Sequence, residues 1–110
     1  MIHVRALGFA ALFVILAAAG PTSAAGDANA AKGLVADHCS KCHEVPGYST
    51  AGHPTLKPPP FQNIADNATT YTEARVRAFL ARPHWPMTQF NLSPSDIDNI
   101  VAFLKSLRAD

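Results

Sequence analysis

The sequence predicts a single all-α domain with proline-rich loops. The chain has 110 residues, which is the length of one domain and excludes most large enzyme folds. Apolar residues recur at helical spacing in several segments, most clearly near the C-terminus. No segment alternates apolar and polar residues for long enough to indicate a strand.

The first element is an N-terminal leader. Residues 6–19 form an unbroken run of fourteen apolar or Gly residues, preceded by an arginine and followed by small residues. These are the parts of a secretory signal peptide. The run is shorter than the roughly 20 residues that cross a bilayer, so a retained membrane anchor is the alternative. We expect cleavage after Ala24 or Ala25, with residues 1–25 the signal peptide and 26–110 the domain.

The next segment is a helix followed by a long loop. Residues 28–38 are rich in helix formers and predict a helix that runs into a cysteine pair. Four residues share one face of it: Ala31, Leu34, Val35 and His38. Residues 45–60 then contain five Pro and two Gly without apolar periodicity, and so long a loop is expected to wrap around another group. Residues 61–67 predict a short helix.

A further helix and a second loop come next. Thr70 followed by Glu73 has the spacing of a capping box, which predicts a helix through Ala81. Its expected core face consists of Val76, Phe79 and Leu80. Pro83 ends this helix, and residues 83–92 form a second constrained loop.

The last helix has the clearest signals. Ser93 is a good N-cap, Pro94 suits the first helical position, and Asp96 complements the positive end of the helix. Its apolar residues form one broad face: Ile97, Ile100, Val101, Phe103, Leu104 and Leu107. Such a face must pack against other apolar groups.

Composition indicates that the domain needs support beyond its own core. After removal of the leader, few apolar side chains larger than Ala remain, and a small domain with so thin a core is marginal. The two cysteines are too close in sequence to close a stabilising loop, so we expect a metal or a large apolar cofactor. Without the leader, basic and acidic side chains are equal in number, so no basic surplus remains for binding nucleic acid.

The motif that carries chemistry is CSKCH at residues 39–43. The pattern C-x-x-C-H is typical of covalent attachment of a c-type haem. On a helical turn Cys39 and Cys42 can meet the two vinyl groups at one haem edge while His43 reaches the iron. Three alternatives exist: a redox dithiol, a zinc site or a structural disulfide. The dithiol lacks its usual strand, zinc lacks further ligands at familiar spacing, and the disulfide leaves the histidine unexplained.

A haem iron bound by His43 needs a second axial ligand or an open site. Met87 is the only methionine left once the leader is removed, and it lies in the constrained loop before the last helix. A methionine is usually a core filler, but this position favours ligation of the iron by its sulfur. His84 and His53 are the rival ligands.

Other side chains are expected near the haem. A metal-bound imidazole donates its second N–H to a fixed acceptor, and for His43 this acceptor is expected to be one of three carbonyls, those of Pro58, Pro59 and Pro60. Phe61 and Trp85 are predicted to be core aromatics against the haem. His38 is expected at the surface or against a haem propionate.

Residues 28–107 resemble the class I monohaem cytochromes c, in particular the small bacterial members. Four segments carry the resemblance in the family's order: CSKCH at 39–43, PPPF at 58–61, ARPHWPM at 81–87 and LSPSDIDNIVAFLKSL at 92–107. The resemblance implies a cytochrome c fold, with three to four helices and proline-rich loops around one covalent haem c. It implies that Cys39 and Cys42 carry the haem, that His43 is the proximal ligand and that Met87 is the distal one. The further residues expected to contact the haem are Pro60, Phe61 and Trp85.

The helix crossing departs from the family pattern. In that family the first and last helices cross closely, with a small residue on the first and an aromatic on the last, which Phe103 matches. The family usually has Gly eight residues before the first cysteine and often an aromatic four before it. This chain has Ala31 and Val35 there, and Ala is small enough to preserve the crossing.

The function implied by the resemblance is that of a soluble one-electron carrier, not an enzyme. It would shuttle electrons between exported redox partner proteins in the periplasm, without nucleic acid and without a membrane anchor once the leader is cleaved. The alternatives are an electron-accepting subunit of a periplasmic dehydrogenase, which would add a catalytic subunit as partner, and a haem-based gas sensor with a displaceable methionine. The donor, the acceptor, the reduction potential and the oligomeric state are not encoded in recognisable form.

Overall fold

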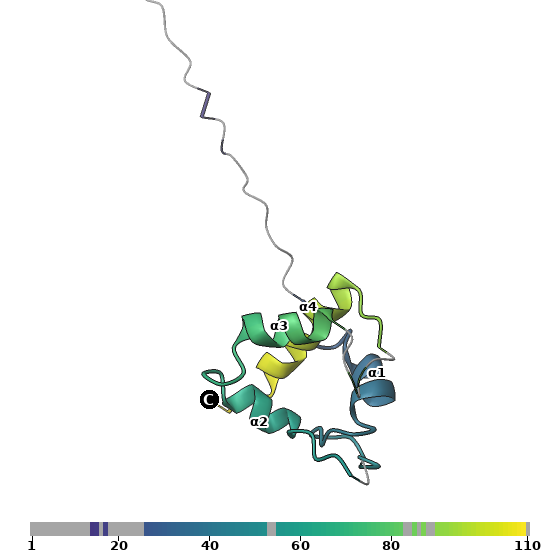
Figure 1. Ribbon diagram of the computed structural model, residues 1–110. Helices are drawn as coiled ribbons and strands as arrows, with labels where there is room; N and C mark the ends of the chain where they lie inside the picture. The colour runs from purple at the N-terminus through teal and green to yellow at the C-terminus, as the bar shows by residue number, and fades with distance from the viewer. Residues whose placement is uncertain are drawn as a thin grey trace, which may run out of the picture.

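The chain is helical wherever the structure assigns regular elements. The computed structural model describes residues 14, 15, 17, 26–52, 55–82, 85, 87 and 90–109. In chain order its elements are α1 (Lys32–Leu34), the π-helix η1 (Val35–Cys39), α2 (Phe61–Asp66), α3 (Glu73–Ala81) and α4 (Pro94–Ser106). No strand occurs in these ranges, and α4 contacts both α2 and α3 (Figure 1). The all-α prediction is confirmed.

None of the helices in the described ranges is long and apolar enough to cross a bilayer. The predicted leader, residues 1–25, lies outside the described residues except at positions 14, 15 and 17.

The helix predicted over residues 28–38 begins later than expected and continues as a π-helix. Residues 28–31 form turns instead. In η1 the amide of Ser40 donates to the carbonyl of Val35 at 2.9 Å, five residues back. The Ser40 hydroxyl donates to the carbonyl of Ala36 at 2.8 Å. A hydroxyl bonded four residues back competes with the regular helical ladder, which accounts for the local change of winding.

The burial of this segment follows the expected face for three of its residues. Ala31 and Val35 are buried and Leu34 is half-buried, whereas His38 is exposed, which agrees with the surface position expected for it. The next buried residue is Cys39. The wider π turn therefore brings residue 39, rather than 38, below Val35.

Helix α2 matches the predicted short helix to within one residue, whereas α3 departs from the prediction at its start. The N-cap is Thr72, not Thr70, and its side chain accepts from the amide of Arg75 at 3.2 Å. Thr72 has the extended backbone that an N-cap requires directly before Glu73.

The predicted core face of α3 is only partly correct. Val76 and Leu80 are half-buried and pack against the core, but Phe79 is 51% exposed. No residue of α3 is fully buried. The helix lies at the edge of the fold, where one narrow row of side chains is enough to cover its neighbour.

Helix α4 begins and packs as predicted. Ser93 accepts from the amide of Asp96 at 3.1 Å, and the Asp96 carboxylate accepts from the amide of Ser93 at 2.9 Å, which is a complete capping box with Pro94 behind it. The buried residues of α4 are Ile97, Ile100, Val101, Phe103 and Leu104.

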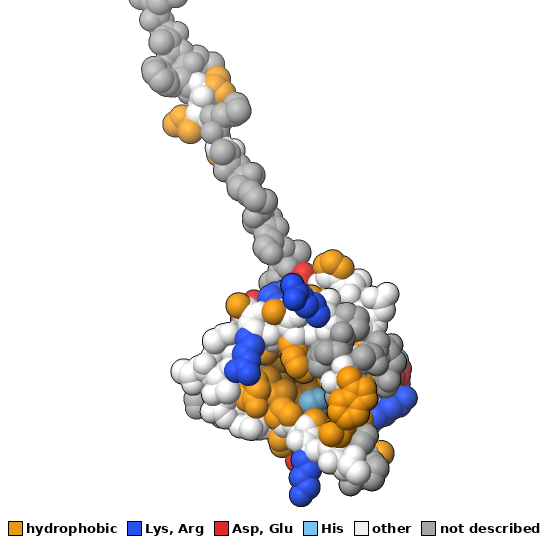
Figure 2. Space-filling view, viewed as in Figure 1, with side chains coloured by type: hydrophobic (Ala, Val, Ile, Leu, Met, Phe, Trp, Pro, Cys, Tyr) orange, Lys and Arg blue, Asp and Glu red, His pale blue; other side chains and the backbone are white. Residues whose placement is uncertain are grey.

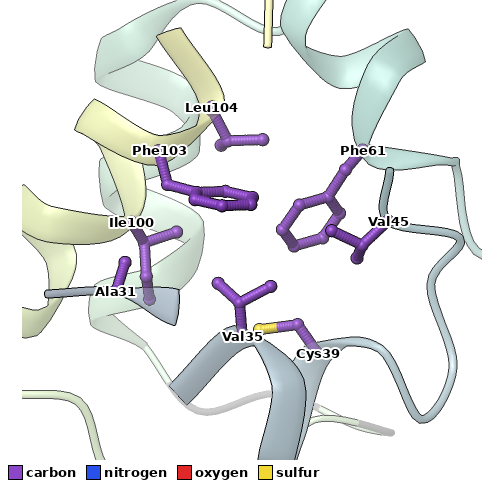
Figure 3. Close-up of a cluster of buried hydrophobic side chains, with 8 residues drawn as sticks. All are labelled: Ala31, Val35, Cys39, Val45, Phe61, Ile100, Phe103 and Leu104. Atoms are coloured by element: carbon purple, nitrogen blue, oxygen red, sulfur yellow. The ribbon is translucent and has the colours of Figure 1, made fainter. Parts of the chain in front are cut away.

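One cluster of buried side chains joins the first segment, the proline loop and α4. Figure 3 shows its eight members: Ala31, Val35, Cys39, Val45, Phe61, Ile100, Phe103 and Leu104. The ring of Phe103 meets that of Phe61 edge-on at a centroid distance of 6.3 Å. Ala31 lies beside Ile100, so the small residue expected at the helix crossing faces α4. Cys39, the first of the two cysteines, is therefore part of the core.

Half-exposed ion pairs tie α3 to α4. The Arg77 guanidinium contacts the Glu73 carboxylate at 3.0 Å and the Asp98 carboxylate at 2.6 Å. The Lys105 ammonium contacts Glu73 at 2.5 Å. The hydrogen bond from Lys105, followed by that from Arg77, holds the pKa of the Glu73 carboxyl below its usual range. Exposed pairs of this kind contribute little individually, and they fix the orientation of α3 more than they stabilise it.

Candidate functional site

The two cysteines and the histidine of CSKCH lie on one tight turn at the end of η1. The amides of Cys42 and His43 both donate to the carbonyl of Cys39, at 3.2 and 2.9 Å. Both thiols are free, with Cys39 buried and Cys42 exposed. Burial raises the pKa of the Cys39 thiol to about 11. The turn has the i, i+3, i+4 arrangement that the sequence predicted.

The imidazole of His43 is buried and held by the proline loop. His43 is only 9% exposed, and its Nδ1 donates to the carbonyl of Pro59 at 2.7 Å. The prediction that one of three proline carbonyls accepts from His43 is confirmed, and the acceptor is Pro59 rather than Pro58 or Pro60. A carbonyl can only accept, so Nδ1 is the donor in this bond, and Nε2 is the ring nitrogen that remains for a metal ion.

Two further hydrogen bonds close the proline loop at the same place. The amide of Phe61 donates to the carbonyl of Glu44 at 2.9 Å, and the Thr50 hydroxyl donates to the carbonyl of His43 at 3.0 Å. The start and the end of the loop therefore run side by side at His43. The acceptor of the imidazole N–H is fixed by main-chain pairing rather than by a movable side chain.

The loop leaves His43 through a turn that its sequence dictates. Residues 45–48 read Val-Pro-Gly-Tyr, and the amide of Tyr48 donates to the carbonyl of Val45 at 3.0 Å. Gly47 has φ +85°. Pro at the second position and a residue of positive φ at the third are typical of a type II turn, where Gly avoids the strain of a side chain. The turn places the half-buried Tyr48 against Phe103, at a centroid distance of 6.4 Å.

A pocket of about 430 Å³ lies beside this loop, lined by Glu44, Val45, Pro46, Tyr48, Thr50, Pro60 and Gln62. Neither cysteine nor His43 lines it. Its Thr50 hydroxyl is bonded to the His43 carbonyl, and the Gln62 amide donates to the carbonyl of Leu107. The pocket adjoins the CSKCH turn but is separate from it.

Phe61 lies in the protein core, as the sequence predicted, and Trp85 does not. Phe61 is buried, and its ring meets the His43 ring edge-on at a centroid distance of 5.2 Å. Trp85 is 74% exposed, and its contact with the haem stays a prediction. Pro60 is half-buried at the end of the loop.

Met87 is half-buried between α3 and α4, and its carbonyl accepts from the amide of Phe90 at 3.3 Å. The ring of Phe90 meets the ring of His38 edge-on at 5.1 Å. Sequence reasoning did not single out Phe90, although an aromatic three residues after the predicted ligand was a usable signal. The rival ligands His53 and His84, like Pro83, lie outside the described residues.

The described surface has one hollowed face on which hydrophobic side chains gather. Figure 2 shows a histidine side chain among them, and Lys and Arg side chains at several points around the hollow. The buried imidazole of His43 and the thiols of Cys39 and Cys42 lie on one turn of chain, and these groups are suited to hold an apolar group that carries a metal ion.

Comparison with known proteins gives one match. Residues 28–108 match the family described as cytochrome c, a range that begins before α1 and ends after α4. No curated protein and no solved structure matches the chain. With the greater part of its length matched, this chain belongs to the cytochrome c family.

Proposed function

We propose that the protein is an exported, soluble one-electron carrier whose iron is ligated by His43 and Met87. The cytochrome c family binds covalently attached haem c and carries out haem-based electron transfer with redox partner proteins. The observation that carries the finer proposal is the hydrogen bond from Nδ1 of the buried His43 to the Pro59 carbonyl at 2.7 Å. This bond leaves Nε2 as the free nitrogen of the imidazole. His43 directly follows the free thiol of Cys42 and comes four residues after that of Cys39.

Cys39 and Cys42 are the residues we propose for haem attachment. Each thiol would add across one vinyl group: the sulfur forms a C–S bond, and the proton goes to the neighbouring carbon. The addition needs no oxidant or reductant. The buried Cys39 is a member of the core cluster, so its thioether would join the haem edge to the core. This attachment supplies the support that the thin core requires.

Met87 is the proposed distal ligand. It is half-buried and lies in the segment that leads into α4. A thioether opposite an imidazole raises the reduction potential and closes the iron to outside ligands, which suits electron transfer. Pro60, Phe61 and Trp85 are proposed to contact the haem, Phe61 through the edge that it presents beside His43.

We also propose that residues 1–25 are removed on export and that the carrier works in the periplasm. Contacts of residues 26 and 27 support this boundary. The amide of Asp27 donates to Asn99 Oδ1 at 2.8 Å, which ties the chain to α4. At Gly26 a Cβ atom would clash with the Asp98 carbonyl oxygen, so only Gly fits against the helix there. Both residues expected to begin the mature domain therefore pack against α4.

Mass spectrometry and visible spectra of the exported protein test the proposal. The denatured chain should keep the mass of one haem, and the ferric protein should show the weak far-red band of iron bound to methionine sulfur. Met87→Ala should abolish that band and lower the potential, whereas His84→Ala and His53→Ala should keep it. A band that survives Met87→Ala excludes Met87 as the ligand. Rapid binding of carbon monoxide to the unaltered ferrous protein would instead favour a gas sensor.

A further inference from the structure

The segment that precedes the haem-attachment motif touches the segment that carries Met87. The ring of His38 meets the ring of Phe90 edge-on, with centroids 5.1 Å apart and planes at 66°. His38 is the residue directly before Cys39, and Phe90 lies three residues after Met87. The contact therefore joins two parts of the chain that are distant in sequence and that both serve the proposed haem site.

The contact reaches Met87 through the backbone. The amide of Phe90 donates to the carbonyl of Met87 at 3.3 Å, so these two residues are joined by one turn of chain. Beyond Phe90, the half-buried Leu92 packs against the core cluster. Leu92 thus anchors the end of the loop to the core. Closer to Met87, the packing of the Phe90 ring on the His38 ring holds the turn that bears Met87.

We propose that His38 is a positioning residue for the distal ligand: its ring, packed on Phe90, holds the 87–90 turn against the haem-attachment segment and keeps the Met87 sulfur at the iron. The inference rests on the proposed ligation by Met87. An edge-on aromatic pair stabilises the arrangement it belongs to by a factor of about 2 to 10 in an equilibrium constant. Loss of the pair should ease displacement of Met87 by that factor.

The position of His38 makes this effect measurable without unfolding the protein. His38 is exposed and is not a member of the core cluster, so truncation leaves no cavity there. Phenylalanine at the same position keeps a ring for Phe90, whereas alanine removes it. Lys32, exposed on α1, is a matched surface control that carries no such contact in the described structure.

Imidazole titration of the ferric, haem-loaded protein tests the inference, with loss of the far-red methionine band as the readout. His38→Ala should bind imidazole about 2- to 10-fold more tightly than the unaltered protein. His38→Phe and Lys32→Ala should bind it with unchanged affinity. Phe90→Ala should reproduce His38→Ala, and the double variant should add little.

Three outcomes would overturn the inference. His38→Ala could bind imidazole as the unaltered protein does, His38→Phe could match His38→Ala, or Lys32→Ala could show the same gain. None of these affects the assignment of Met87, which fails separately if the far-red band survives Met87→Ala. The two results therefore distinguish failure of the positioning contact from failure of the ligand itself.

Discussion

The segment around His43 and the segment around Met87 are held by different kinds of contact. At His43 the main chain provides them: the Pro59 carbonyl accepts from the imidazole, and the Glu44 carbonyl accepts from the Phe61 amide. Phe61 and Val45, on either side of the loop, belong to the core cluster. Because each of these contacts is made by the protein chain, we expect the chain itself to set the orientation of the His43 imidazole.

At Met87 the contacts lie near the surface. Met87 and Phe90 are half-buried, Trp85 is 74% exposed, and the ring that packs on Phe90 belongs to the exposed His38. The hydrogen bond between the Phe90 amide and the Met87 carbonyl, at 3.3 Å, is longer than those around His43.

This difference indicates where the site should open. Segments with few buried apolar contacts open at a lower free energy than the core to which they are attached. If Met87 is the distal ligand, as proposed, opening of the 87–90 turn would expose that side of the iron while His43 stays bonded to Pro59. Displacement of Met87 should then precede unfolding of the domain.

The largest expected effect is on the His43 side. Phe61→Ala should lower the free energy of unfolding by about 3–5 kcal/mol, because removal of a buried ring that packs on both His43 and Phe103 leaves a cavity. Phe90→Ala, which removes a ring of the same size that is only half-buried, should cost less. Urea unfolding of the haem-loaded protein, followed by far-ultraviolet circular dichroism, measures both.

Phe61→Leu serves as the matched control, since it keeps most of the apolar volume and should cost less than about 1.5 kcal/mol. If Phe90→Ala proves as costly as Phe61→Ala, the Met87 segment is anchored as firmly as the core and the contrast does not hold.

The helices could be predicted from the sequence where local and long-range signals agree. In α4 the cap and the proline indicate the same start, the apolar face continues from it, and the structure has both. In α3 the capping-box spacing predicted Thr70 as the cap, whereas the structure has Thr72, whose extended backbone before the helix is not reported by sequence spacing. The π winding of η1 follows from one side-chain hydrogen bond, that of the Ser40 hydroxyl.

The candidate site shows the same division. The CSKCH turn could be predicted because its chemistry lies in five consecutive residues. The need for a carbonyl beside His43 was predictable, but selection of Pro59 required the pairing of Phe61 with Glu44. Exposure of Trp85 and the contact between His38 and Phe90 could not be predicted, since both depend on how two distant segments meet in space.

A smaller effect is expected at Ser93, where the Met87 segment passes into α4. Ser93→Ala removes the acceptor of the Asp96 amide and should cost about 1 kcal/mol of unfolding free energy. Thr72→Ala makes the same chemical change at the start of α3. Because α3 has no fully buried residue whereas α4 carries five, the loss should be smaller at Thr72. Equal losses in thermal unfolding of the two variants would contradict this ranking.

The smallest effect concerns the charge in the same cap. The hydrogen bonds from the amide and then the hydroxyl of Ser93 hold the pKa of Asp96 below its ordinary value of 3.8. The folded state therefore favours the carboxylate, and this stabilisation is present above pH 3.8 and lost as the pH falls through the lower, folded-state pKa. Asp96→Asn keeps an acceptor oxygen and removes the charge, so the unaltered protein should be more stable at pH 6 by about 0.3–1 kcal/mol, and less so at pH 3.

Urea unfolding at the two pH values measures that difference, and an advantage of the same size at pH 3 would contradict the assignment of the low pKa to the capping box.

The imidazole affinity of the ferric protein at pH 6 compares the two regions in the same variants. Asp96 lies in α4 and not in the 87–90 turn, so Asp96→Asn should leave that affinity unchanged while it lowers global stability. His38→Ala should do the reverse, because its contact belongs to the turn and not to the core. Opposite responses of these two surface variants would separate the free energy that opens the distal segment from the free energy that unfolds the domain.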